Sequence, residues 1–113
     1  MGIAQGAFDA AMAHAQERRQ FGKAISSFEA IRNKLVEMDR KIERARLLTH
    51  KAASQYDAGE DVVRISSIAK WDASEAAREV AQEAVQILGA YGYTRDYAPQ
   101  RHLRDAKLME IGE

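Results

Sequence analysis

Apolar side chains recur every three or four residues along most of this 113-residue chain, and charged residues fill the positions between them. This spacing is that of one face of an α-helix, so the sequence predicts three long helices. The apolar positions are Ile3, Ala7, Phe8, Ala11, Met12 and Ala15 in the first helix, Phe28, Ile31, Leu35, Met38, Ile42, Ala45 and Thr49 in the second, and Ile65, Ile68, Ala69, Ala73, Ala76, Val80, Ala84 and Ile87 in the third.

The first break in this pattern lies within residues 20–30. Gly22 is the first strong helix breaker, so the first helix is expected to end near Gln20. Ser26 and Glu29 then match the S-x-x-E capping box, in which each side chain accepts a hydrogen bond from the other residue's backbone N–H. The second helix is therefore expected to begin at this box.

Later breaks set the remaining helix ends. The sequence Asp-Ala-Gly at residues 57–59 predicts the end of the second helix, and Asp61 is a suitable cap for the third. Gly89 is expected to close the third helix, and the tyrosine- and glycine-rich segment 90–98 to form a loop. Pro99 suits the first turn of a fourth helix that runs to about Glu110.

The order of these elements predicts the fold class. Short connections make consecutive helices antiparallel neighbours, so we expect an all-α, antiparallel up-and-down four-helix bundle. The third helix is rich in alanine, which permits close approach of its neighbours. No segment has the alternating pattern of a strand, and no internal repeat is evident.

Composition excludes several classes of function. Lys and Arg number 17, as do Asp and Glu, so the net charge is zero and no basic field favours nucleic acid. The chain has no cysteine, which excludes disulfides, thiolate metal sites and cysteine nucleophiles. No apolar stretch is long enough to span a membrane.

The three histidines do not form a metal motif. Di-iron helical bundles need Glu-x-x-His on two helices, and no such motif occurs here. We therefore interpret His14, His50 and His102 as ordinary surface or boundary residues, and we expect no metal site. Basic residues between positions 34 and 51 alternate with acidic ones, which favours a solvated, ion-paired helix face over a nucleic-acid surface.

Two short segments have both a structural and a functional interpretation. Arginines in ERRQFG, residues 17–22, suit a helix C-terminus, but guanidinium groups beside an aromatic also suit phosphate and a stacked base. Gly89 in GAYGY, residues 89–93, suits a helix stop, but two tyrosines beside two glycines also suit a ligand or partner surface. Composition leaves both alternatives open.

Three longer segments resemble a known family in their sequence and their order. They are GIAQGAFDAAMAHAQERRQFGKAI at residues 2–25, AVQILGAYGYTRDY at 84–97 and RHLRDAKLMEIGE at 101–113. Together they look like the C-terminal helical domain of the acyl-CoA dehydrogenases. The resemblance implies that residues 1–113 form this bundle domain, without the N-terminal helical and middle β domains. Met1 then falls inside the first helix of the domain.

The resemblance implies FAD as the cofactor. Arg18 would contact the pyrophosphate and Phe21 would pack near the adenine of the FAD of a neighbouring subunit. At Glu29 the family usually has glutamine, and at Ala90 it usually has a second glycine. The positions that the resemblance assigns to FAD binding are Arg18, Gln20, Phe21, Phe28, Glu29, Gln86, Gly89 and Ala90.

The resemblance also implies a catalytic base. Alignment of the last segment without a gap places Glu113 on the glutamate that removes the α-proton of an acyl-CoA, while the β-hydrogen leaves as hydride to the flavin. Gly112 stands where the family commonly has tyrosine. Some relatives place the base on the preceding helix instead, upstream of Met1.

Further expectations follow from the same resemblance. The partners would be the acyl-CoA substrate, identical subunits in a homodimer or homotetramer, and electron-transfer flavoprotein. The compartment would be the bacterial cytoplasm or the mitochondrial matrix. The isolated chain is expected to fold without turning over acyl-CoA. The alternatives are an acyl-CoA oxidase or a flavin monooxygenase of the same superfamily, or a non-catalytic helical assembly module.

Overall fold

The computed structural model describes residues 1–112, and these form five helices and one small hairpin. The four longer helices confirm the predicted all-α bundle. The elements are α1 (Gly2–Glu17), β1 (Arg19–Gln20), β2 (Lys23–Ala24), the 3₁₀ helix η1 (Ile25–Ser27), α2 (Glu29–Asp57), α3 (Val63–Leu88), α4 (Ala90–Tyr93) and α5 (Pro99–Ile111).

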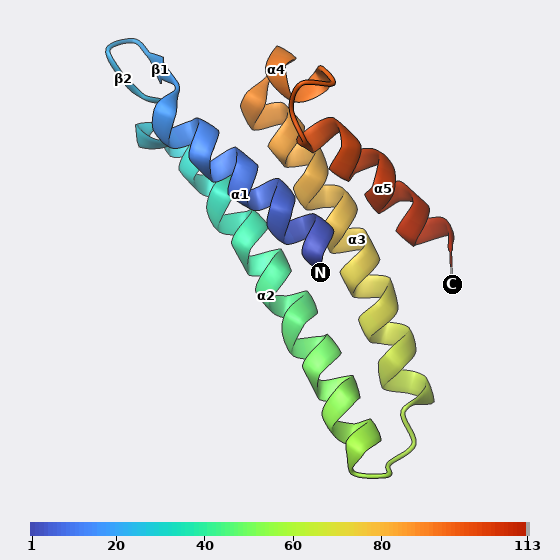
Figure 1. The fold of residues 1–113 in the computed structure, drawn as a ribbon. Coiled ribbons are helices and arrows are strands. Elements are labelled where there is room, and N and C mark those ends of the chain that lie inside the picture. The colour runs from blue at the N-terminus through green and yellow to red at the C-terminus, as the bar shows by residue number, and fades with distance from the viewer. Residues whose placement is uncertain (113) are drawn as a thin grey trace.

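The long helices alternate in direction, so α1, α2, α3 and α5 form an up-and-down bundle (Figure 1). Helix α3 is central and contacts α1, α2 and α5. Because α2 has 29 residues and α3 has 26, this pair extends well beyond the 16-residue α1 and the 13-residue α5. The upper part of the molecule therefore has four helices in cross-section, whereas the lower part has two.

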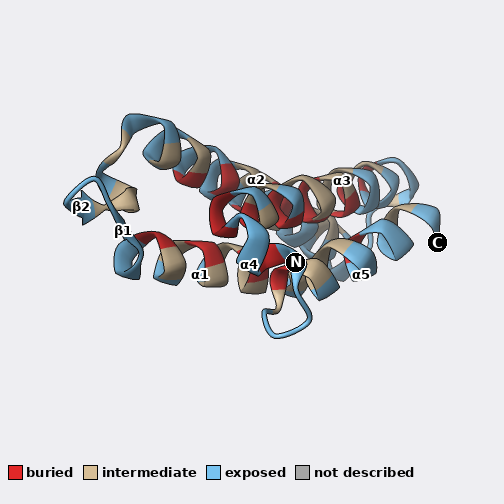
Figure 2. Ribbon diagram, turned by 90° about the horizontal axis from the view of Figure 1, so that it is seen from above, coloured by how far each residue is buried: buried red, intermediate tan, exposed pale blue. Residues whose placement is uncertain are grey.

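The core consists largely of alanine where α1 meets α3. Four alanines of α1 are at most 1% exposed, and three alanines of α3 are at most 3% exposed in the same apolar cluster. These buried positions face the inside of the bundle in Figure 2. Larger side chains, Met38, Ile42 and Val80, fill the space beside α2. We call the alanine cluster the alanine seam: Ala4, Ala7, Ala11, Ala15, Ala77, Ala81 and Ala84.

The beginning of α2 corrects the predicted capping box. Helix α1 ends at Glu17 rather than near Gln20, and no side-chain hydrogen bond caps α2. Residues 25–27 form the 3₁₀ helix, and Phe28 occupies the N-cap in an extended conformation. The Ser27 hydroxyl donates to the backbone carbonyl of Ala24 at 2.7 Å. A local turn therefore takes the place of the pairing expected between Ser26 and Glu29.

The other predicted helix ends agree closely with the structure. Gly59 has a φ of +75°, and N–H groups of Gly59 and Glu60 donate to the carbonyls of Tyr56 and Gln55, each at 3.0 Å. This is the Schellman arrangement that ends a helix at glycine. The prediction that Asp61 caps α3 is off by one residue, because Val62 is the N-cap; Asp61 lies just before it and accepts a hydrogen bond from the Val63 N–H at 3.0 Å.

Ion pairs link the helices outside the core. Lys34 pairs with Glu83 at 2.5 Å and Lys41 with Glu79 at 2.7 Å, so charges on α2 reach α3 as well as their own helix.

One apolar position was assigned wrongly, because Thr49 is exposed and its hydroxyl donates to a carbonyl of its own helix. None of the helices within residues 1–112 is both long and apolar enough to cross a membrane.

Candidate functional site

A tight hairpin joins α1 to α2. Strands β1 and β2 pair antiparallel, and the two residues between them, Phe21 and Gly22, have φ values of +53° and +80°. Positive φ at both central residues is typical of the type I′ hairpin turn. Glycine adopts this conformation freely, whereas a bulky side chain such as Phe21 is strained in it. We call residues 18–28 the hairpin corner.

Aromatic and cationic side chains gather on the hairpin corner. The Lys23 ammonium lies 4.4 Å from the centre of the Phe28 ring, within the range of a cation–π contact. The Phe21 and Phe28 rings meet edge to face with their centres 6.2 Å apart. Phe21 nevertheless remains 92% exposed. The corner therefore presents a planar apolar ring to solvent beside a positive charge.

A second turn follows α3. Gly89 ends α3 with a φ of +62°, and the four-residue helix α4 begins directly after it. A Cβ atom at Gly92 would lie 2.9 Å from backbone atoms of Val85, so only glycine lets α4 fold this closely onto α3. The predicted loop therefore contains one helical turn. We call residues 89–97 the tyrosine turn.

The hairpin corner and the tyrosine turn lie at the same end of the molecule (Figure 1). The Arg18 guanidinium carbon lies 5.8 Å from the centre of the Tyr91 ring. The centre of the Tyr91 ring lies 6.1 Å from that of the His14 ring. On the tyrosine turn itself, the ring centres of Tyr91 and Tyr97 are 5.5 Å apart. Burial, and then the positive charge of Arg18, hold the pKa of His14 below its ordinary value. The imidazole beside Tyr91 is therefore uncharged near neutral pH.

The structure divides the sequence-predicted cofactor positions between these two regions. Arg18, Gln20, Phe21, Phe28 and Glu29 lie on or next to the hairpin corner. Among residues 1–112, only Arg18 of this set contacts an aromatic ring of the tyrosine turn. The Gln20 amide instead donates a hydrogen bond to the Arg19 carbonyl.

The remaining cofactor positions lead into the tyrosine turn. Gln86 lies in the last turn of α3, and Gly89 and Ala90 follow it. The predicted base, Glu113, lies outside the described residues. Its neighbour Gly112 is at the far end of α5, away from the hairpin corner (Figure 1).

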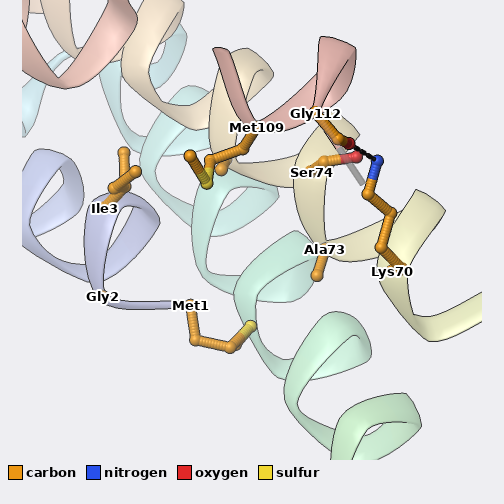
Figure 3. Close-up of a pocket in the computed structure, with 9 residues that line it drawn as sticks. Met1, Gly2, Ile3, Lys70, Ala73, Ser74, Met109 and Gly112 are labelled. Atoms are coloured by element: carbon orange, nitrogen blue, oxygen red, sulfur yellow. Dashed lines mark hydrogen bonds between the residues drawn. The ribbon is translucent and has the colours of Figure 1, made fainter. Parts of the chain in front are cut away.

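A hollow of about 430 Å³ lies at that far end, between α1, α3 and α5 (Figure 3). Its wall is mostly apolar, and the Lys70 ammonium donates a hydrogen bond to the Gly112 carbonyl at its edge. No group of three or more metal-binding side chains occurs in the described part of the chain. The hollow is lined by Met1, Gly2, Ile3, Lys70, Ala73, Ser74, Ala77, Met109 and Gly112.

Comparison with known proteins identifies the family. The sequence model described as "Acyl-CoA dehydrogenase, C-terminal domain" matches residues 1–113. The chain belongs to the acyl-CoA dehydrogenase family. Probable acyl-CoA dehydrogenase YngJ of Bacillus subtilis is 49% identical over 113 residues, which are 100% of this chain and 30% of YngJ. The resemblance noted in the sequence is thereby confirmed.

Solved structures confirm the fold of this family domain. Butyryl-CoA dehydrogenase from Megasphaera elsdenii superposes with a TM-score of 0.96 at 44% identity, over 97% of this chain and 29% of that chain. The FAD complex of PigA superposes with a TM-score of 0.92 at 28% identity, over 97% of this chain and 28% of that chain. Flavin is thus present among the structural relatives of the acyl-CoA dehydrogenase domain.

One relative is named with a protein partner. The caffeyl-CoA reductase–Etf complex subunit CarC of Acetobacterium woodii is 43% identical over 113 residues, which are 100% of this chain and 30% of CarC. The chain spans about three tenths of the length of YngJ, CarC and the butyryl-CoA dehydrogenase.

The residues of the hairpin corner fit the chemistry of an adenine dinucleotide. Arg18 offers a planar cation, the group that best matches phosphate oxygens. Phe21 offers an exposed ring in a strained conformation, and an exposed ring of this kind suits stacking against a planar base. Glycine at position 22 has nothing within 4 Å of its missing Cβ, so the backbone beside the ring can be approached closely.

Two side chains of this acyl-CoA dehydrogenase domain contact aromatic rings of the site, and neither is among the positions that the resemblance assigns to FAD. His14 was interpreted as an ordinary boundary residue, yet its ring lies 6.1 Å from the Tyr91 ring, tilted by 55°. Lys23 covers the Phe28 ring. The signal for Lys23 was its place just after the Phe-Gly turn, whereas nothing in the spacing of His14 indicated a partner 77 residues away.

Proposed function

We propose that this chain is the C-terminal helical bundle domain of an FAD-dependent acyl-CoA dehydrogenase, with the N-terminal helical and middle β domains in the rest of the polypeptide. The reaction is the formation of an α,β double bond in an acyl-CoA thioester. The observation that carries the proposal is the contact of Arg18 with Tyr91, because it unites the two segments that the family resemblance assigns to FAD.

In this proposal the hairpin corner holds the nucleotide half of FAD. Arg18 binds the pyrophosphate by charge-assisted hydrogen bonds, and Gln20 adds polar contacts. Phe21 packs near the adenine, with Phe28 and Glu29 beside it. Gln86, Gly89 and Ala90 line the adenosine from the start of the tyrosine turn. When bound, FAD supplies the acceptor for the hydride that leaves the β-carbon of the substrate.

Glu113 is the base in the same proposal. Its carboxylate takes the α-proton of the acyl-CoA as the β-hydrogen departs with its electron pair, so the products are the enoyl-CoA and the reduced cofactor. Specificity for acyl chain length depends on residues outside this domain.

The distance between the hairpin corner and the end of α5, where the proposed base follows, supports a role for a second subunit. Helix α1 spans roughly 24 Å at 1.5 Å per residue, and it separates the hairpin corner from the Gly112 end of α5. In line with the family resemblance, the hairpin corner of one subunit would hold the nucleotide half of the FAD that serves the active site of its neighbour. This arrangement requires a homodimer, and pairing of two dimers gives the homotetramer. Electron-transfer flavoprotein is the proposed electron acceptor, in the bacterial cytoplasm or mitochondrial matrix.

Variants of the full-length protein test this function. We expect the purified protein to be yellow with FAD and to reduce an artificial acceptor in the presence of acyl-CoA. Arg18→Gln should raise the FAD dissociation constant by about tenfold or more, since a charge-assisted bond contributes roughly 1.5–3 kcal/mol. Glu113→Gln should keep FAD and lower kcat by about 100-fold or more.

Arg64→Gln is the matched control, because Arg64 is an exposed arginine at the opposite end of α3. It should bind FAD like the parent protein. Colourless protein that does not take up added FAD would contradict the proposal and favour an assembly module. Consumption of oxygen in place of the artificial acceptor would assign the protein to the oxidases. The isolated 113-residue chain should fold but show no turnover.

A further inference from the structure

The backbone of Arg18 is fixed where α1 passes into the hairpin corner. Its N–H donates to the His14 carbonyl at 2.8 Å and closes the last turn of α1. Its carbonyl accepts a hydrogen bond from the Ile25 N–H, also at 2.8 Å, on the segment that returns from the hairpin. Both hydrogen-bonding groups of the residue are therefore engaged, and the point from which the Arg18 side chain starts is well defined.

The Arg18 side chain contacts a ring rather than a carboxylate. Other arginines, such as Arg40 and Arg44, pair with carboxylate oxygens at 2.6 and 2.7 Å, and no such pair forms at Arg18 among residues 1–112. Gly112, the last described residue, lies at the opposite end of the molecule (Figure 1). The exposed Arg18 guanidinium lies over the Tyr91 ring, with its carbon 5.8 Å from the ring centre. Its N–H donors are therefore left for an anion from outside the chain.

Tyr91 is itself held in place by its surroundings. Its carbonyl accepts hydrogen bonds from the Thr94 N–H at 3.2 Å and from the Thr94 hydroxyl at 3.0 Å. Gly92, the next residue, lies so close to the backbone of α3 that a Cβ atom there would clash, which fixes α4 on α3. The ring centres of His14 and Tyr97 lie 6.1 and 5.5 Å from that of Tyr91. The half-exposed Tyr91 ring is thus a supported surface beside Arg18.

Contact with an aromatic face suits a guanidinium that also binds phosphate. A cation over the face of a tyrosine ring is attracted by the quadrupole of the ring. The five N–H donors of a guanidinium lie in its plane, so contact through one face leaves the donors at its edge free for phosphate oxygens. An exposed arginine has many rotamers, and restricting them before the ligand arrives lowers the entropy lost on binding.

We propose that Tyr91 is a positioning residue for Arg18: its ring holds the guanidinium beside the tyrosine turn before the cofactor binds, so that less conformational freedom is lost when Arg18 takes the diphosphate of FAD. The proposal rests on the proposed function, because it takes Arg18 as the ligand of that diphosphate. It adds a residue that the family resemblance does not assign to FAD. Tyr91 acts in this role through Arg18 and not through its own contact with the cofactor.

The experiment measures FAD binding to the full-length protein, freed of cofactor, by isothermal titration calorimetry. Tyr91→Leu removes the ring, whereas Tyr91→Phe keeps the ring and removes only the hydroxyl. Arg18→Gln and the double variant Arg18→Gln/Tyr91→Leu complete a double-mutant cycle, which isolates the interaction between the two residues. Tyr93→Leu is the matched control, since Tyr93 is an 82% exposed tyrosine of the same short helix.

We expect Tyr91→Leu to raise the Kd for FAD about two- to fivefold, the size of a cation–π contact at an exposed site. Tyr91→Phe and Tyr93→Leu should bind FAD like the parent protein. With Arg18→Gln already present, Tyr91→Leu should have no further effect, because the cation that the ring holds is gone. Unchanged hydrogen–deuterium exchange in the buried part of α3 shows that the fold is intact. Where Tyr91→Leu alters that exchange, Tyr91→Met is the second ring-free variant for the same cycle.

Different outcomes separate the two proposals. If Arg18→Gln weakens FAD binding and Tyr91→Leu does not, Tyr91 has no positioning role and the proposed function stands. If Tyr91→Leu weakens binding equally with and without Arg18, the ring acts on the cofactor or the fold directly, and the positioning role is again wrong. If Arg18→Gln binds FAD like the parent protein, Arg18 is not a ligand of the diphosphate, and the role of Tyr91 fails with that part of the proposed function.

Discussion

The alanine seam and the hairpin corner are adjacent along the chain, yet they use their side chains in opposite ways. In the seam, Ala4, Ala7, Ala11 and Ala15 are at most 1% exposed and have ordinary helical backbones. Shortly after α1 ends, Phe21 is 92% exposed with a left-handed backbone. The smallest side chains are buried and a large apolar one is in solvent. The seam is organised for stability, whereas the role that we propose for the corner is binding.

This difference predicts different tolerance to change. Methyl groups let the backbones of α1 and α3 approach closely, so the seam has no room for a larger side chain. At the hairpin corner, the side chains of residues 18–23 are exposed, so replacing one of them removes little packing. Substitutions in the seam should therefore change the free energy of unfolding, and those in the corner should chiefly change binding.

The largest effect is expected from Ala11→Leu in the seam. Ala11 is 0% exposed, and the added atoms must push α1 away from α3. We expect the free energy of unfolding to fall by about 1–3 kcal/mol, measured by urea denaturation of the isolated chain. Ala13→Leu, on the exposed face of the same helix, is the matched control and should change it little. Equal losses in both variants would mean that the seam is not tightly packed.

A smaller effect is expected from pH, through two partly buried histidines that flank these regions, His14 on α1 and His102 on α5. Burial, followed by Arg18 for His14 and by Arg101 for His102, lowers the pKa of each below its ordinary value. The nearby carboxylates Glu17 and Asp105 oppose these shifts. Below about pH 6.5 the unfolded chain therefore takes up protons that the folded chain resists, so stability falls as the pH decreases through that region.

Single glutamine variants identify which histidine causes this loss of stability. His102 packs on Gly6, where a Cβ atom would lie 3.1 Å from the imidazole, whereas His14 lies beside Tyr91. His102→Gln and His14→Gln should each flatten the loss of stability between about pH 7 and pH 5, measured by urea denaturation at each pH. The lowered pKa values of Glu37 and Glu110 act only in more acidic solution, below about pH 4.5. A slope that survives both substitutions would show that neither histidine is its source.

The seam was predictable in part from the sequence, because a helix repeats its buried face every three or four residues; Ala4, Ala77 and Ala81 were not among the predicted positions. Ala7, Ala11 and Ala15 were all placed correctly by that period. The hairpin corner was not, since two local signals competed there. Ser26 and Glu29 have the spacing of a capping box, but the type I′ turn at residues 21–22 sets the path of the chain, and Phe28 caps α2 instead.

The site was predictable only in part, for a related reason. The family resemblance identified both segments, but the approach of Arg18 to Tyr91 joins residues 73 positions apart, and it depends on how α1 and α3 pack. The bond from Lys70 to Gly112 depends likewise on the packing of α5 against α3. Sequence periodicity indicates which face of a helix is buried, and it does not indicate which residues of two helices come level with one another.

The smallest change expected is a gain in stability from Phe21→Asn, and it most directly separates the two regions. Asparagine tolerates the left-handed conformation better than phenylalanine, and the exposed ring contributes little packing beyond its contact with Phe28. We expect the free energy of unfolding of the isolated chain to rise by about 0.5 kcal/mol. Tyr93→Asn, which removes an 82% exposed ring from a backbone with negative φ, should give no gain. In the full-length protein, Phe21→Asn should bind FAD more weakly. A variant that is both more stable and unimpaired in FAD binding would show that the strain at Phe21 does not serve the cofactor.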